Sequence, residues 1–287
     1  MSEAQPAYVR PRDLDEAVAV RAAHPDWMVL AGGTDLLVNA GHRAPPPGII
    51  DLWRLPEICA VCAVRVADGA IAIGAGATWL EIERDPQIQA HAAPLAACAR
   101  EIGALQIQAR GTLGGNIATS SPVGDSLPVL LALDAELELA SPRGARRVAY
   151  RDWCTGYRTT QLLPDELIAW VHLPVPVASS GRAIRMAWRK VGTRRAQSIS
   201  KVMGAAAIAI EGDTVVDARV ALGAVADRPI RLLAVEAAVR GLGLGAAAEA
   251  ARAAVRASIQ PIDDVRSTAR YRREVAENLV ARFFSVA

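Results

Sequence analysis

Two glycine pairs set the strongest constraint on how this chain folds. The first lies in "AGGTDLLV", residues 31–38, and the second in "TLGGNIATSS", residues 112–121. Glycine adopts positive φ readily and lets another group touch the backbone, so successive amides at such a site can converge on an anion. Either segment alone is equally compatible with a tight turn. Together, each beside strand-like residues, they fit opposite sides of one pyrophosphate.

Polar residues near both pairs favour an anion site. Thr34 or Asp35 is placed to open a helix after the first pair, and phosphate favours a helix N-terminus because free amides face it. Near the second pair, Thr112, Asn116 and Thr119 add side-chain donors. No Gly-Lys-Ser/Thr follows either pair, so neither is a P-loop.

The rest of the chain alternates short strands and helices, a pattern typical of an α+β protein. Hydrophobic residues make up 52% of 287, enough for two or three modest domains. Residues 13–24 form a predicted helix with Asp13 as N-cap, and residues 67–69 a hairpin turn. The best linker candidate is 175–182. Antiparallel strands follow it, and then three helices that begin near residues 230, 244 and 268.

Composition and spacing exclude several classes of function. A net charge of +2 gives no global field for nucleic acid or an acidic membrane. With no signal segment and no run of about 18 apolar residues, we expect a cytoplasmic protein with reduced thiols. Cys59 and Cys62 would face opposite sides of a strand, which predicts core positions instead of metal ligands. The scattered histidines predict no catalytic acid or base, and no metal site is expected.

Five motifs in order resemble the FAD-binding medium subunit of molybdenum hydroxylases, of the xanthine dehydrogenase and carbon monoxide dehydrogenase type. They are "AGGTDLL", "RGTLGGNIATSSPVGDSLPVLLALDAELEL", "DELIAWVHLP", "RKVGTRRAQSISKV" and "DDVRSTARYRREVAENLVARFF". The resemblance covers nearly the whole chain. It implies a two-subdomain FAD-binding fold of the PCMH or vanillyl-alcohol oxidase type over 1–55 and 56–177. A domain of three antiparallel strands and a helical bundle is expected over 178–287.

The resemblance also implies which residues hold FAD. The first loop is expected to contact the cofactor through Val29, Leu30, Ala31, Gly32, Gly33, Thr34, Asp35 and Leu36, and the second through Thr112, Gly114, Gly115, Asn116 and Thr119. Asp125 aligns with an acid near the cofactor, Ile168 with an apolar residue beside the flavin, and Lys190 with a nearby basic residue. From the residues alone, Asp125 is equally a helix cap or an acceptor for ribose hydroxyls. A side chain on Gly32 or Gly114 would block the approach of a ligand to the backbone.

The function implied by the resemblance is electron transfer within a larger complex. A large molybdopterin-binding subunit would oxidise the substrate, and a small [2Fe–2S] subunit would pass electrons to FAD, which reduces NAD⁺ or another acceptor. A dimer of heterotrimers is expected. "NIATSSPVGDSLP" is closer to xanthine dehydrogenase than to the carbon monoxide enzymes, although Gln108 stands where relatives often have arginine. Open alternatives are a carbon monoxide, aromatic or aldehyde hydroxylase subunit, a stand-alone flavin oxidoreductase, and a nucleotide-binding module without redox activity.

Overall fold

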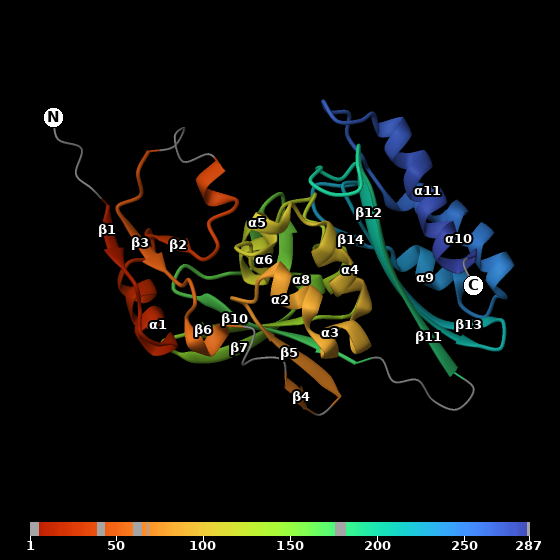
Figure 1. Ribbon diagram of the computed structural model, residues 1–287. Helices are drawn as coiled ribbons and strands as arrows, with labels where there is room; N and C mark the ends of the chain where they lie inside the picture. The colour runs from red at the N-terminus through yellow and green to blue at the C-terminus, as the bar shows by residue number, and fades with distance from the viewer. Residues whose placement is uncertain (1–5, 39–43, 60–64, 68, 176–181, 286–287) are drawn as a thin grey trace.

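A computed structural model describes residues 6–38, 44–59, 65–67, 69–175 and 182–285 (Figure 1). Its elements form three groups along the chain. Figure 1 shows them from left to right as an N-terminal sheet, a central sheet with its helices, and a C-terminal sheet with its helices. The expected α+β class is confirmed. The division at 55/56 and 177/178 stays a prediction.

The N-terminal group is a small parallel sheet with one covering helix. The strand order is β1-β3-β2, formed by β1 (Ala7–Val9), β3 (Gly48–Asp51) and β2 (Met28–Leu30). Helix α1 (Leu14–Ala23) is capped by Asp13, whose side chain accepts from the amide of Glu16 at 2.8 Å, as predicted. Because parallel strands point the same way, the segments that follow them meet at one edge of the sheet.

The central group is a five-stranded antiparallel sheet in the order β4-β5-β10-β6-β7. Its strands are β4 (Arg65–Ala67), β5 (Ala70–Gly74), β10 (Leu167–Pro174), β6 (Glu136–Ser141) and β7 (Gly144–Ala149). The predicted pairing of β4 with β5 is present, and β6 and β7 form a second antiparallel pair. A small two-stranded sheet, β8 (Cys154–Gly156) with β9 (Thr159–Thr160), lies beside this group.

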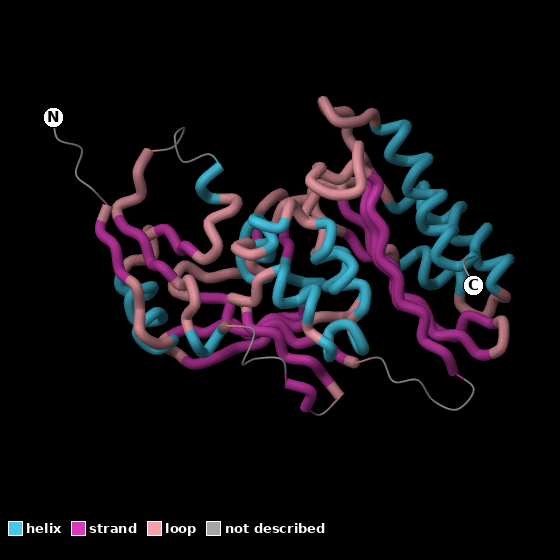
Figure 2. Tube along the Cα trace, viewed as in Figure 1, coloured by secondary structure: helices cyan, strands magenta, loops and turns pink. Residues whose placement is uncertain are grey.

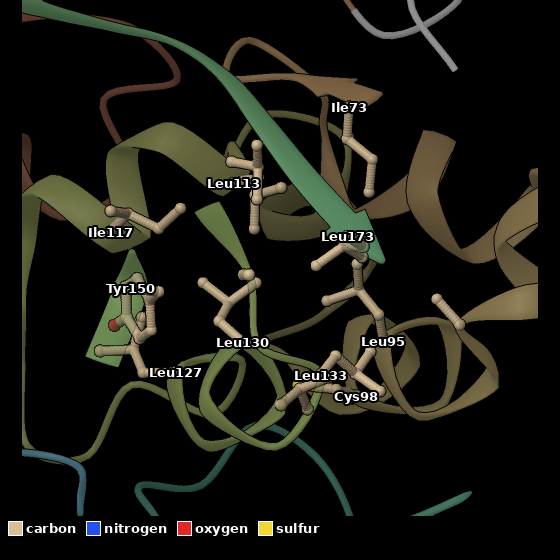
Figure 3. Packing of buried hydrophobic residues seen from close by; sticks show 14 of the residues in the cluster. Ile73, Leu95, Cys98, Leu113, Ile117, Leu127, Leu130, Leu133, Tyr150 and Leu173 are labelled. Atoms are coloured by element: carbon tan, nitrogen blue, oxygen red, sulfur yellow. The ribbon is translucent and has the colours of Figure 1, made fainter. Parts of the chain in front are cut away.

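In the described residues, the central group contains seven α-helices. They are α2 (Trp79–Arg84), α3 (Pro86–His91), α4 (Ala93–Glu101), α5 (Leu105–Gln108), α6 (Leu113–Thr119), α7 (Leu127–Ala132) and α8 (Tyr150–Trp153). Leu113 and Ile117, one helical turn apart on α6, are fully buried in a core shared with Leu130 and Ile73 (Figure 3). This buried face anchors the second Gly-Gly segment to the central sheet.

The C-terminal group has one strand more than expected. Strands β11 (Arg182–Val191), β12 (Val202–Glu211) and β13 (Thr214–Gly223) are followed by a two-residue strand, β14 (Ile230–Arg231). The helices are α9 (Leu233–Val239), α10 (Leu244–Ser258) and α11 (Ala269–Ser285), and they share a core with β12 and β13 (Figure 2). Helices α4 and α7 of the central group also contact this sheet. Strand β12 is thus covered by helices of both groups, which explains its continuous run of small apolar residues.

The cysteine prediction is wrong for one residue. Cys59 lies at the end of a 3₁₀ turn (Pro56–Ile58) instead of within a strand, and it is only half-buried. Its Sγ accepts from the guanidinium of Arg54 at 3.6 Å. Cys62 lies outside the described residues. Among the described cysteines, Cys98 is the fully buried one (Figure 3), and burial raises the pKa of its thiol well above the usual value.

A buried arginine ties α11 to the C-terminal sheet. Arg272 is 3% exposed and donates to the carbonyls of Lys201 and Ala224 and to Asp264 Oδ1 at 2.7 Å. Desolvation by itself would raise the pKa of Asp264, but hydrogen bonds from the Arg266 amide and from Arg272 lower it from 3.8 to about 2. The charged carboxylate therefore stabilises the fold above about pH 4 and stops doing so as the pH falls toward 2.

Asp264→Asn is expected to lower the free energy of unfolding at neutral pH by about 1–3 kcal/mol, because it weakens charge-assisted hydrogen bonds. Denaturant unfolding between pH 7 and pH 2 measures the difference from wild type, which should shrink toward zero through acid. Glu249→Gln, at an exposed side chain on α10, is the matched control and should change little. A difference that stays constant over the whole pH range would contradict the role of the charge.

Candidate functional site

The first Gly-Gly loop begins where β2 ends, at the carboxyl edge of the parallel sheet. Gly33 has φ +75°, a conformation that residues with a Cβ rarely adopt. Thr34 and Asp35 form a turn, and a 3₁₀ turn follows at residues 36–38. The helix predicted to open at Thr34 or Asp35 is therefore replaced by this short 3₁₀ turn, as far as the described residues extend.

Five successive backbone amides of this loop lack a hydrogen-bond partner in the described part of the chain. The backbone N–H groups of residues 32–36 donate to no acceptor among the residues that the structure describes, although four of the five residues are half-buried. Unpaired amides away from water are rare because each one costs about 1–3 kcal/mol. Successive free amides in a turn are the donor set that phosphate oxygens bind. The first loop therefore fits the pyrophosphate of a dinucleotide.

The second Gly-Gly loop is different, because the amides of residues 113–115 already donate hydrogen bonds within the protein. Leu113 N donates to Ala77 O at 2.9 Å and Gly114 N to Ala75 O at 2.8 Å. Thr112 caps α6 by accepting from Gly115 N at 3.1 Å. This loop consequently offers side-chain groups and a close-packed backbone, whereas the run of free amides at residues 32–36 belongs to the first loop.

The two loops meet, as two sides of one site require. A Cβ on Gly32 would lie 1.8 Å from the carbonyl oxygen of Arg110, just before the second motif. Arg110 Nε also donates to Gly32 O at 3.4 Å, and Thr119 Oγ1 donates to Asp35 Oδ2 at 3.4 Å. Segments separated by almost eighty residues are therefore in direct backbone contact.

At Gly32 and Gly114, the atoms that a side chain would meet belong to the protein itself. A Cβ on Gly114 would lie 2.7 Å from the Cβ of Ala75, and one on Gly32 would strike Arg110. Both glycines let protein approach protein, and the expectation that a side chain there would block a ligand stays a prediction. Gly115 is the more open position, since only Thr112 Oγ1 lies within 4 Å of its would-be Cβ.

Asp125 belongs to a buried contact between the central and C-terminal groups. Its two carboxylate oxygens accept from Lys190 Nζ and Ser200 Oγ, each at 2.5 Å, and its carbonyl accepts from Trp188 Nε1 at 3.1 Å. Burial raises the pKa of Asp125, while Lys190 and Ser200 act to lower it. The predicted helix cap is not observed, because α7 follows Ser126 without a side-chain cap. The contact of Asp125 with the cofactor stays a prediction.

Lys190 and Ile168 are both held by contacts within the protein. The Lys190 side chain is 2% exposed and paired with Asp125, and Ile168 is in the central core next to a bulge in β10. The carbonyl of the adjacent Ala169 accepts from Ala75 N at 2.9 Å, so β10 supports the turn on which Gly114 packs. The flavin contacts of both residues stay predictions.

Some residues that build the site were not singled out from the sequence. The turn in "GAGATW", residues 74–79, supports the second loop through residues 75–78, and this support was missed. Trp53 and Arg110, which stack beside the first loop, were also missed. Their positions give a signal in retrospect: Trp53 comes just after a parallel strand and Arg110 just before a glycine motif. Gln108 donates to Arg100 O at 3.0 Å and so tethers α5 to α4.

The described residues contain neither a metal-binding cluster nor a membrane-spanning helix. No group of three or more His, Cys, Asp or Glu residues there is placed to hold a metal ion. Among the described helices, none has the length and apolar character needed to cross a bilayer.

The fold and the free amides of the first loop are typical of a protein that binds a dinucleotide such as FAD. Residues 2–176 match the FAD binding domain in molybdopterin dehydrogenase, and residues 187–287 match the CO dehydrogenase flavoprotein C-terminal domain. The chain belongs to the FAD-binding medium subunits of the molybdenum hydroxylase family, of the xanthine and carbon monoxide dehydrogenase type. The family resemblance in the sequence is confirmed, and FAD is its cofactor.

The relatives of this chain are named after different substrates. The chain is 33% identical over 210 residues to the nicotinate dehydrogenase FAD-subunit of Eubacterium barkeri, covering 71% of this chain and 69% of the relative. It is 29% identical over 283 residues to the xanthine dehydrogenase FAD-binding subunit of Escherichia coli O157:H7, with 98% and 95% coverage. A structure of carbon monoxide dehydrogenase from Hydrogenophaga pseudoflava aligns with a TM-score of 0.90 at 30% identity, covering 98% and 96%.

Proposed function

We propose that this chain is the electron-transfer subunit of a xanthine-dehydrogenase-like complex. Electrons would arrive from [2Fe–2S] clusters on a small partner subunit and leave through FAD, held by this chain, to NAD⁺ or another acceptor. A large molybdopterin-binding subunit would oxidise the substrate, in a dimer of heterotrimers. The observation that carries the proposal is the run of free amides at residues 32–36, in contact with the second glycine loop, in a chain of this family.

The residues of the chain bind and orient the cofactor in this proposal. The amides of residues 32–36 hold the pyrophosphate, and Gly33 provides the turn that exposes them. Side chains of Thr112, Asn116 and Thr119 complete the site from the second loop. When bound, FAD supplies a ring that accepts and releases electrons, which no amino-acid side chain in the site needs to do.

A second candidate is a carbon monoxide dehydrogenase-type subunit. The carbon monoxide enzyme aligns over 98% of the chain with a TM-score of 0.90. Against it, the sequence "NIATSSPVGDSLP" is closer to the xanthine dehydrogenase pattern. Because the substrate would be chosen by the large subunit, the flavin chain alone supports both candidates.

The test is to purify the chain with its two expected partner subunits and to follow the flavin spectrum. We expect FAD in the complex, bleaching by xanthine, and recovery of the oxidised spectrum on adding NAD⁺ with formation of NADH. A folded, intact complex without FAD would contradict the electron-transfer role. Bleaching by carbon monoxide but not xanthine would replace the first candidate with the second, and turnover by the isolated chain would favour a stand-alone oxidoreductase.

A further inference from the structure

A tryptophan stacked with two arginines lies beside the free amides. Trp53 lies two residues after the end of β3, at the same edge of the parallel sheet where the first loop leaves β2. Its amide donates to Asp51 Oδ1 at 2.9 Å, and its carbonyl accepts from Arg10 at 3.1 Å, so its backbone is held on both sides. The guanidinium carbon of Arg110 lies 3.8 Å from the ring centroid, and that of Arg54 lies 5.0 Å away.

The two arginines differ in how their charge is balanced. Arg54 is paired with Glu81, at 2.7 Å. Arg110 has no ion pair with any carboxylate that the structure describes, and its side chain donates only to Gly32 O, through Nε at 3.4 Å. Stacking on an aromatic face fixes a guanidinium while leaving its terminal nitrogens free to donate.

The guanidinium of Arg110 lies next to the free amides of the first loop. Gly32 O, which contacts Arg110, belongs to the peptide whose N–H is that of Gly33, one of the five unpaired amides. An unpaired guanidinium next to unpaired amides is a set of donors without an acceptor. Phosphate oxygens satisfy both kinds of donor, and charge-assisted bonds from arginine are roughly twice as strong as neutral ones.

We propose that Arg110, positioned by Trp53, binds the diphosphate of FAD and neutralises its charge. The inference rests on the proposed cofactor role of the first loop and adds a cation to a site otherwise made of amides and hydroxyls. Trp53 is a positioning residue, which holds the guanidinium over the loop without contacting the phosphates. NAD⁺ carries the same diphosphate chemistry, so the experiment separates the two dinucleotides.

The experiment titrates FAD and riboflavin into the flavin-free complex carrying Arg110→Ala, Arg110→Lys or the matched control Arg54→Ala. Arg110→Ala should weaken FAD binding by about 10- to 100-fold, because a charged hydrogen bond is lost. Riboflavin, which has no phosphate, should bind as in wild type. Arg110→Lys should recover part of the FAD affinity, and Arg54→Ala should stay near wild type. Trp53→Ala should weaken FAD binding, whereas Trp53→Phe, which keeps an aromatic ring, should bind FAD as wild type does.

The outcomes separate this inference from the function on which it rests. A wild-type complex that binds no FAD overturns the proposed function. Wild-type FAD affinity in Arg110→Ala overturns the role of Arg110 alone. Equal losses for FAD and riboflavin would make the residue structural, which also overturns the inference. An unchanged FAD affinity with a raised KM for NAD⁺ would assign Arg110 to the other dinucleotide and contradict the proposal.

Discussion

Gly32→Ala is expected to lower FAD affinity by about 100-fold, at the upper end of what overpacking usually costs. The added Cβ would lie 1.8 Å from the carbonyl oxygen of Arg110 and 2.5 Å from its carbonyl carbon. Both are backbone atoms, so no change of rotamer relieves the overlap. The first loop must therefore move away from the second, and the free amides of residues 32–36 move with it.

FAD absorbance per chain and fluorescence titration of the flavin-free complex measure the effect. Gly245→Ala is the matched control, because its Cβ would meet nothing within 4 Å and it lies in helix α10. Gly114→Ala should resemble Gly32→Ala, since its Cβ would lie 2.7 Å from the Cβ of Ala75. Normal FAD content in a folded Gly32→Ala protein would show that loop contact is not needed for the cofactor.

Local patterns were enough to predict most of the fold. Asp13 caps α1 because a short acceptor before an amphipathic segment acts within three residues. The predicted pairing of β4 with β5 depends on a local turn, and the final helix, α11, depends on the helical period of its apolar residues. The half-buried position of Cys59 was not predictable locally, because it depends on a 3₁₀ turn where a strand was expected.

The candidate site could be predicted only in part, because its contacts are long-range. The glycine pairs and their polar neighbours are visible in the sequence. Which atom lies opposite each glycine is not, since Gly32 meets Arg110 from 78 positions away. Asp125 shows the same limit: a carboxylate before a helix suggests a cap, and only the fold shows Lys190 beside it, 65 positions further on.

The buried pair of Asp125 and Lys190 joins the end of the second glycine segment to β11. The side chains are 10% and 2% exposed, and burial raises the pKa of Asp125 even though Lys190 opposes this change. Desolvation therefore offsets much of the attraction between the charges, as is common for buried pairs. The pair is expected to fix where the two parts meet and to add little net stability.

Asp125→Ala should nevertheless be strongly destabilising, by about 3–5 kcal/mol, because it leaves the ammonium of Lys190 buried without its counter-charge. Removing both charges in Asp125→Leu/Lys190→Met should restore most of this loss, since no unpaired charge remains. Asp152→Ala, at an exposed carboxylate, is the control. Denaturant unfolding of wild type, Asp125→Leu, Lys190→Met and the double variant gives the coupling free energy. If the pair sets the position of the loop, the double variant should regain stability but bind FAD more weakly than wild type. A cost below about 1 kcal/mol for Asp125→Ala would mean that Lys190 finds water or another acceptor, and that the pair does not hold the loop.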